Sequence, residues 1–186
     1  MSAPAFEHPW AVALSQRLKE RNETIAFAES CTGGLLSSLV ARIPGVSTVF
    51  MGSLVTYSNE AKVKLLGVPE DVLRANGAVS APVALAMAKG ARERLGADWS
   101  VSITGVAGPG GGTPQKPVGT VFLALNGPGL DGRGVERVTK RLFRGTRREI
   151  QFRSARYALA MMLIELGFSK EELRNLLAAE KAGKRR

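Results

Sequence analysis

The sequence predicts an α/β protein, a three-layer α/β/α sandwich with a mixed, mostly parallel sheet of about five strands. Short apolar segments that suit buried strands alternate along the chain with segments whose apolar residues recur every three or four positions. This alternation is typical of a sheet that helices cover on both faces. A length of 186 residues with 45% hydrophobic residues fits one folded domain and not a disordered chain. We expect residues 1–168 to form this domain and residues 169–186 to add a C-terminal helix and a basic tail.

Each expected helix combines apolar residues at helical spacing with residues that mark its ends. Trp10, Leu14 and Leu18 lie on one face of the first helix. Ser58 and Ser80 are expected to cap two later helices, because a serine hydroxyl satisfies a free N–H of the first turn. The expected helices cover residues 9–21, 35–43, 59–66, 69–75, 80–95, 146–166 and 169–181.

The expected strands are apolar and β-branched segments bounded by turn residues. They cover residues 24–28, 46–57, 99–104, 118–125 and 135–143. No helix separates the last two, so we expect a hairpin whose final strand, with charges on one face, lies at an edge. Ligands of such sheets bind at the carboxyl ends of the strands. We therefore expect Ser30, Tyr57 and Thr104, which follow or end three strands, along one edge of the sheet.

A single histidine, His8, restricts the chemistry that this chain can perform. A Ser-His-Asp triad, a Cys-His pair and a histidine-rich metal site all need an imidazole, and His8 lies beside a proline near the N-terminus. We therefore expect no histidine-rich metal site and a nucleophile that another group activates. The one cysteine, Cys31, cannot form a disulfide within the chain, which fits a reducing compartment.

Composition also bears on location and partners. No apolar run reaches the ~18 residues that cross a bilayer, and the N-terminal residues do not resemble a secretory signal, so we expect a cytoplasmic protein with no membrane partner. The net charge of +10 lies mostly in residues 133–186, which hold 15 Lys and Arg against 6 Asp and Glu. Such asymmetry allows nucleic-acid binding. A solvated basic helix face is the commoner origin of a charge run, so nucleic acid is the less favoured partner.

The segment AESCTGG is predicted to turn from a strand into a helix. A helix N-terminus offers unpaired N–H groups that suit a phosphate or a developing oxyanion, and glycine lets a substrate approach the backbone. Ser30 is the candidate nucleophile. Candidates for binding the substrate or the oxyanion are Thr32, Gly33 and Gly34. The same residues also suit a plain N-cap with tight packing, and Cys31 suits a small buried side chain better than a second nucleophile.

Lys62 lies in a predicted short helix, on the same face as Leu65 and Leu66. Apolar neighbours remove part of the hydration of an ammonium group and lower its pKa, and a base near neutrality needs a fall from about 10.4 to roughly 7–8. A surface lysine whose alkyl chain covers these leucines is the commoner arrangement, so the spacing leaves both interpretations open. Tyr57, just before this helix, is placed to donate to or orient the same site.

The glycine-rich segment 105–112 follows the strand that ends at Thr104. It superficially resembles a dinucleotide-binding fingerprint, but Pro109 and the lack of a suitably placed acidic residue after a second strand argue against one. We expect either a mobile loop over a site or a long turn. The hydroxyl of Thr104 is expected to point into the crevice beside it.

Four ordered motifs, AESCTGG, YSNEAK, TGVAGPGGG and FRGTR, resemble the C-terminal domain of the CinA competence/damage-inducible family. The resemblance covers roughly residues 9–168 and includes the strand PVGTV. The family includes the stand-alone nicotinamide mononucleotide deamidase PncC. Because the chain is too short for the N-terminal molybdopterin-binding-like domain of full-length CinA, we expect the stand-alone form.

The resemblance implies a three-layer α/β/α domain that hydrolyses nicotinamide mononucleotide to nicotinate mononucleotide and ammonia, without a metal or an organic cofactor. Ser30 matches the nucleophile of the family, and Lys62 matches its general base. Supporting or substrate-binding positions are matched by Tyr57, Thr104 and Arg147. Thr146 departs from the family pattern, in which an acidic residue often follows the glycine of the FxGxR element. We expect a small nucleotide substrate and a homo-oligomer.

The competing function is a binding module without catalysis. Such a competence- or damage-associated protein would contact a nucleotide or DNA through its basic C-terminal third. Duplex binding that weakens steeply with salt, together with no release of ammonia from nicotinamide mononucleotide, would favour it.

Overall fold

The computed structural model describes residues 8–183. Five strands form one sheet in the order β2-β1-β3-β4-β5. They are β1 (Ile25–Glu29), β2 (Phe50–Val55), β3 (Trp99–Gly105), β4 (Thr120–Gly127) and β5 (Val135–Leu142). β1 pairs in parallel with β2 and β3, whereas β4 pairs antiparallel with β3 and β5, so β4 runs against the other four strands. The predicted mixed sheet and its terminal hairpin are confirmed.

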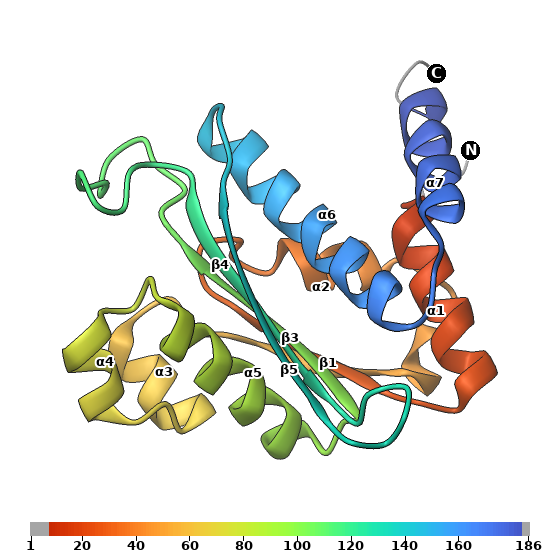
Figure 1. The fold of residues 1–186 in the computed structure, drawn as a ribbon, viewed down its shortest axis with the longest axis horizontal. Helices are drawn as coiled ribbons and strands as arrows, with labels where there is room; N and C mark the ends of the chain where they lie inside the picture. The colour runs from red at the N-terminus through yellow and green to blue at the C-terminus, as the bar shows by residue number, and fades with distance from the viewer. Residues whose placement is uncertain (1–7, 184–186) are drawn as a thin grey trace, which may run out of the picture.

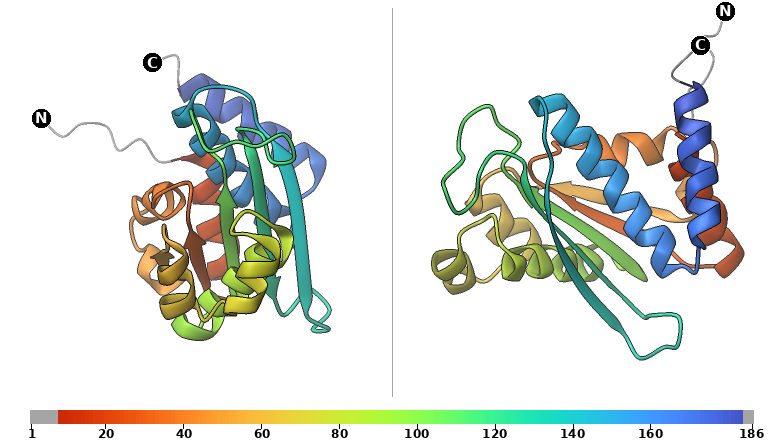
Figure 2. Two further views of the ribbon diagram at one scale, coloured as in Figure 1. Left: turned by 90° about the vertical axis from the view of Figure 1, so that its left-hand side faces the viewer. Right: turned by 45° about the horizontal axis from the view of Figure 1, so that its top comes forward.

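Helices cover both faces of this sheet (Figure 1 and Figure 2). One layer contains α1 (Pro9–Arg21), α2 (Leu35–Ala41) and α6 (Arg147–Glu165), and the other contains α3 (Asn59–Leu66), α4 (Glu70–Asn76) and α5 (Ala81–Leu95). α7 (Lys170–Gly183) packs against α1, where the Trp10 indole N–H donates to Glu180. The three-layer prediction is confirmed. Within the described residues, no helix combines the length and apolar composition that crossing a bilayer requires.

The core is divided by the sheet into two apolar layers. Phe27 and Ala28 are neighbours in β1, yet Phe27 packs with the residues of α1, α2 and α6, and Ala28 packs with those of α3, α4 and α5. This follows from the strand geometry, in which successive side chains point to opposite faces. The same alternation places the functional side chains that follow β1.

Two local predictions were wrong. Residues 46–57 do not form one strand, because Val46–Thr48 is a single 3₁₀ turn and β2 begins only at Phe50. Val46 and Val49 are both buried, and their spacing of three suits a 3₁₀ turn better than the alternation of a strand. Ser80 does not cap α5 through its side chain; its hydroxyl donates instead to the carbonyl of Gly77, 2.8 Å away.

The position of α3 depends on a glycine in the middle of α5. A Cβ atom at Gly90 would lie 1.8 Å from the carbonyl oxygen of Leu66, the last residue of α3. The two helices therefore approach more closely than any side chain at this position allows. α3 also begins and ends as predicted, because the Ser58 hydroxyl accepts from the N–H of Ala61 and Gly67 takes the left-handed conformation with φ of 67°.

Gly90→Ala is therefore expected to lower the melting temperature, although glycine-to-alanine changes inside helices normally stabilise by about 0.5–1 kcal/mol. Pushing α3 away from α5 should cost about 1–3 kcal/mol, as overpacking does in cores. Thermal unfolding followed by circular dichroism measures the effect. Glu93→Ala, at an exposed position of the same helix, is the control with little expected change. A Gly90→Ala protein that is as stable as the parent would contradict the close-packing argument.

Candidate active site

A pocket of about 270 Å³ lies beyond the carboxyl ends of β1 and β3. The glycine-rich loop after β3 forms one wall, through Gly105–Gly108, Gly110 and Gly111. Val106 holds this loop against β4, because its N–H donates to the carbonyl of Thr120 over 2.9 Å. Five of the residues singled out from the sequence line the pocket together: Ser30, Tyr57, Lys62, Thr104 and Arg147.

The closest pair in this pocket is Ser30 and Lys62, which are 32 positions apart in the chain. The Nζ atom of Lys62 lies 3.1 Å from the Oγ atom of Ser30 and 2.8 Å from the carbonyl oxygen of Thr56. Both side chains are buried, with exposed fractions of 1% for Lys62 and 8% for Ser30. An ammonium would donate to both oxygens, whereas a neutral amine can donate to Thr56 and accept the hydroxyl proton of Ser30.

Burial lowers the pKa of Lys62, because removing an ammonium from water disfavours its charged form. No carboxylate among residues 8–183 forms an ion pair with it. The sequence pattern had left a surface lysine open, and the structure instead buries the side chain. Leu66 is buried beside it in α3, whereas Leu65 is 47% exposed. The expected apolar face is therefore narrower than the spacing indicated.

Glu29, the last residue of β1, is fully buried, and its carboxylate caps the N-terminus of α2. Its Oε2 atom accepts from the N–H groups of Gly34 and Leu36 over 3.1 and 3.0 Å. Its Oε1 atom accepts from the N–H and the hydroxyl of Ser37, each over 2.8 Å. The carboxylate thus occupies the N-terminus of α2, which is the place where an external anion would bind. Because Glu29 itself ends β1 and its side chain binds the N–H of Gly34, it links the start and the end of the turn that contains Ser30.

The N–H groups of Gly33 and Gly34, which we predicted as oxyanion donors, both have partners within the protein. The N–H of Gly33 donates to the carbonyl of Ser30 over 3.1 Å, and the N–H of Gly34 donates to Glu29. Neither these glycines nor Thr32 lines the pocket, and the hydroxyl of Thr32 is buried without a hydrogen-bond partner. Among the hydrogen bonds of the described residues, the N–H groups of Cys31 and Thr32 donate to no other residue. These two are the donors that remain near Ser30.

Cys31 is a buried side chain with an exposed fraction of 5%. Burial raises the pKa of its thiol to about 12, because the thiolate would lose its hydration. The reactive form is therefore scarce at neutral pH. The environment of Cys31 agrees with the predicted structural role and leaves Ser30 as the better nucleophile.

Arg147, the first residue of α6, lines the pocket. Its guanidinium donates to the carbonyl of Gly108 over 2.7 Å and to the hydroxyl of Tyr57 over 2.5 Å. Thr146 caps α6 through a capping box with Glu149, so its departure from the family pattern still leaves the helix well started. On the floor, the buried Thr104 hydroxyl donates to the carbonyl of Ala78 over 2.9 Å.

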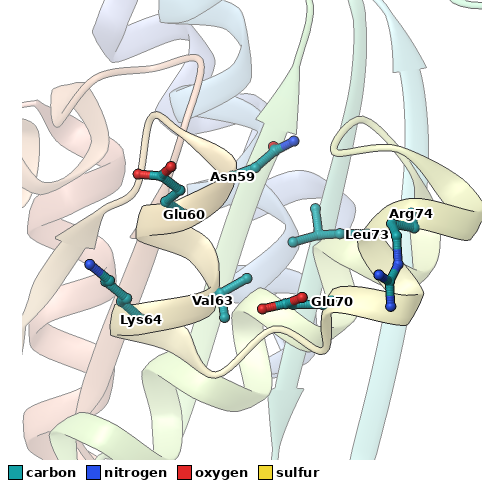
Figure 3. Close-up of a pocket in the computed structure, with 7 residues that line it drawn as sticks. All are labelled: Asn59, Glu60, Val63, Lys64, Glu70, Leu73 and Arg74. Carbon is teal, nitrogen blue, oxygen red and sulfur yellow. The ribbon is translucent and has the colours of Figure 1, made fainter.

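Two other cavities lack this combination of groups. One, of about 390 Å³, lies between α3 and α4, where Val63 and Leu73 face each other and Lys64 points away (Figure 3). The other, of about 840 Å³, lies beside α6 and is lined by Arg148, Arg153 and Arg156. Arg148, which follows Arg147 in α6, lines this second groove and not the pocket of Ser30 and Lys62. Within the described part of the chain, no group of three His, Cys, Asp or Glu residues is arranged to hold a metal ion.

The sequence model of the CinA C-terminal domain matches residues 7–166. The chain belongs to the CinA C-terminal domain family. It is 51% identical to a CinA-like protein of Chlorobaculum tepidum over 149 residues. The aligned region covers 80% of this chain and 35% of that protein. A CinA-like protein of an Anaeromyxobacter strain is 49% identical over 150 residues, 81% of this chain and 36% of that protein. The chain spans about a third of the length of the curated relatives it matches.

Solved structures of CinA proteins share the fold. The competence/damage inducible protein CihA of Agrobacterium tumefaciens superimposes with a TM-score of 0.79 at 39% identity, over 90% of this chain and all 100% of that one. A CinA superfamily protein of Escherichia coli gives a TM-score of 0.79 at 35% identity, over 88% of this chain and 92% of that one. The resemblance read from the four motifs is confirmed.

Sequence reasoning missed two functional positions in this CinA domain. Glu29 lies inside the AESCTGG motif, and an acidic residue just before a helix start is a recognisable capping signal. Thr56 contributes through its backbone carbonyl, which no side-chain pattern reveals. Both act on the Ser30–Lys62 pair, one by fixing the turn of the serine and the other by holding the amine.

Glu29→Gln tests the capping role. The amide group of glutamine would turn a donor toward one of the N–H groups that the carboxylate accepts from, so we expect about 1–3 kcal/mol of lost stability. Ser37→Ala removes a single hydroxyl donor to Glu29 and is the milder control, at about 1 kcal/mol. Denaturant unfolding measures both. Equal stability of Glu29→Gln and the parent would show that the cap does not hold the turn.

Proposed function

We propose that this protein is an amidohydrolase that converts nicotinamide mononucleotide to nicotinate mononucleotide and ammonia, with Ser30 as nucleophile and Lys62 as general base. The observation that carries the proposal is the buried Lys62 amine, 3.1 Å from the Ser30 hydroxyl and without a carboxylate partner among residues 8–183. A lysine that loses its proton at moderate pH can activate a serine without an imidazole or a metal.

In the proposed first step, neutral Lys62 takes the hydroxyl proton of Ser30, and Oγ attacks the carboxamide carbon. The negative charge that develops on the carboxamide oxygen is held by the N–H group of Cys31, a residue that lines the pocket. The N–H after a nucleophilic serine serves this purpose in other strand-to-helix turns, and one such donor is worth about 3–4 kcal/mol. Lys62 then gives its proton to the departing ammonia. Water, activated by the same amine, hydrolyses the acyl-enzyme.

The polar groups of the pocket fit a carboxamide nucleotide. The proton of the Thr104 hydroxyl is used on Ala78, so its oxygen can only accept, and the carboxamide NH₂ group is a donor. The pocket is lined by no acidic residue, and Arg147 contributes a positive charge to it. Arg147 retains donors beyond the two used on Gly108 and Tyr57, and these suit the 5′-phosphate of the substrate.

Ser30→Ala is expected to abolish ammonia release from nicotinamide mononucleotide while the fold is kept. Lys62→Arg should reduce kcat by about 10²–10⁴-fold, because a guanidinium cannot accept the proton. Lys64→Arg is the matched control, since Lys64 lies on the exposed side of the same helix and should keep full activity. A coupled ammonia assay on the three variants, with circular dichroism as the folding check, decides the outcome. Undiminished turnover by Ser30→Ala would remove Ser30 from the mechanism.

The pH profile tests the base independently. Burial holds the pKa of Lys62 below the ordinary value of 10.5, and only the neutral amine accepts a proton, so kcat/KM should rise with pH and level off below 10.5. In the same pH window the unfolded chain binds more protons than the folded one, so stability should also rise with pH there. Residual turnover of Lys62→Arg should lack this rise. An activity profile that falls with increasing pH would exclude Lys62 as the base.

A further inference from the structure

The backbone carbonyl of Cys31 has no hydrogen-bond partner within its own segment. In a regular helical turn it would accept from the N–H of Gly34 or Leu35, three or four residues later. Here Gly34 donates to the carboxylate of Glu29, and Leu35 donates to the carbonyl of Thr32 over 3.2 Å. Because Cys31 is buried, an unpaired carbonyl at this position would be costly, and the donor has to come from another element.

Gln151 of α6 supplies this donor. Its side-chain amide donates to the Cys31 carbonyl over 2.8 Å, across 120 positions of the chain. Glutamine suits the position because its amide group carries two N–H donors and no net charge. A glutamate of the same length would turn only acceptors toward the carbonyl. It would also bring a negative charge close to the oxygen on which negative charge develops in the proposed reaction.

Cys31 is thereby held from both sides. On one side, the N–H of Ser30 donates to the carbonyl of Ile103 in β3 over 3.0 Å. On the other side, the carbonyl of Cys31 accepts from α6. The N–H of Cys31, which the proposed reaction uses to hold the oxyanion, lies between these two anchors. Rotation of the adjoining peptide groups would turn this N–H away, and an oxyanion donor is effective only when it already points at the developing charge.

Gln151 follows Arg147 by four positions in α6, so both side chains leave the helix on one face, about 6 Å apart along its axis. Arg147 lines the candidate pocket, where we propose that it binds the 5′-phosphate. Gln151 does not line this pocket and lies instead at the groove beside α6. It therefore acts on the reaction through Cys31 and not by touching the substrate.

We propose that Gln151 is a positioning residue of the amidase reaction, which directs the N–H of Cys31 toward the carboxamide oxygen. The inference rests on the proposed function, because this N–H is needed only where negative charge develops on a substrate oxygen. The contacts of Lys62 with Ser30 and with the Thr56 carbonyl do not involve Gln151. The residue should therefore affect kcat, while the pH dependence set by Lys62 stays unchanged.

Gln151→Met removes the donor and keeps the length of the side chain. We expect kcat for nicotinamide mononucleotide to fall about 10–100-fold, a part of the 10²–10³-fold effect of removing an oxyanion donor, with KM changed less than about threefold. Gln151→Lys restores an N–H donor and should recover most of the rate, whereas Gln151→Glu should be at least as slow as Gln151→Met. Gln16→Met, the same substitution at an exposed position of α1, is the control that should keep full activity.

A serine-reactive fluorophosphonate separates positioning from stability. Oγ of Ser30 bonds to phosphorus, fluoride leaves, the hydroxyl proton passes to Lys62, and negative charge grows on the phosphoryl oxygen as it does on the carboxamide. Mass spectrometry measures the labelling rate, and labelling to completion counts the intact sites, so kcat is obtained per intact site. If Gln151 only stabilised the fold, Gln151→Met would lower the melting temperature and the number of intact sites but not the rates per site.

Equal turnover and labelling per intact site in Gln151→Met and the unmodified chain would overturn the proposal, and so would a Gln151→Lys protein no faster than Gln151→Met. If Gln151→Met does not fold, the ratio of the Gln151→Lys rate to the Gln151→Glu rate decides the matter. If the unmodified chain is labelled at Ser30 but releases no ammonia, the proposed function fails, and the labelling rates still decide the role of Gln151. A chain in which Ser30 reacts with neither compound overturns both.

Discussion

The contact between the Lys62 amine and the Ser30 hydroxyl requires a lysine to stay buried without an acid beside it. Burial lowers the pKa of Lys62, and the free energy that its desolvation costs must be offset by packing elsewhere. Three features hold α3 and the Lys62 amine in place. The helix is capped at both ends, Leu66 packs closely against Gly90 of α5, and the carbonyl of Thr56 accepts a hydrogen bond from the amine.

The alternation of side chains along β1 keeps the carboxylate of Glu29 away from the amine of Lys62. Glu29 and Ser30 are adjacent in the chain, so their side chains leave the end of β1 toward opposite faces of the sheet. The carboxylate enters the α2 layer, where five backbone and hydroxyl donors hold it, and the serine faces Lys62 in the α3 layer. If the carboxylate reached Lys62, it would stabilise the ammonium and remove the base. The sheet therefore lets one short motif contain an acid that fixes the turn of Ser30 without forming an ion pair with Lys62.

Periodicity and turn residues predict where the helices, the strands and the hairpin lie. They also predict that Ser30, Tyr57 and Thr104 share one edge of the sheet. These features are local, or depend only on the rule that parallel strands end together. The internal partners of the predicted oxyanion donors at Gly33 and Gly34 could not be foreseen, because a sequence shows which N–H groups a helix start leaves open but not which acceptor reaches them. The carboxylate of Glu29 accepts from the N–H of Gly34, and the carbonyl of Ser30 accepts from the N–H of Gly33. Spacing left the burial of Lys62 undecided, since its amine is held by Ser30 and the Thr56 carbonyl, and the contact with Ser30 spans 32 positions of the chain.

Net charge and local charge have separate origins in this protein. Several cations of the basic final third are used in internal contacts: Arg137 pairs with Glu165, Arg141 lies on the ring of Tyr157, and Arg153 donates to the carbonyl of Arg144. These cations bind the last strand, the end of the hairpin and α6 to one another. The candidate pocket receives one cation from this region, Arg147, because the capping box at Thr146 starts α6 at that point. An anionic substrate would therefore be bound by Arg147, whose position is set by the start of α6. The overall charge of +10 does not by itself indicate the partner.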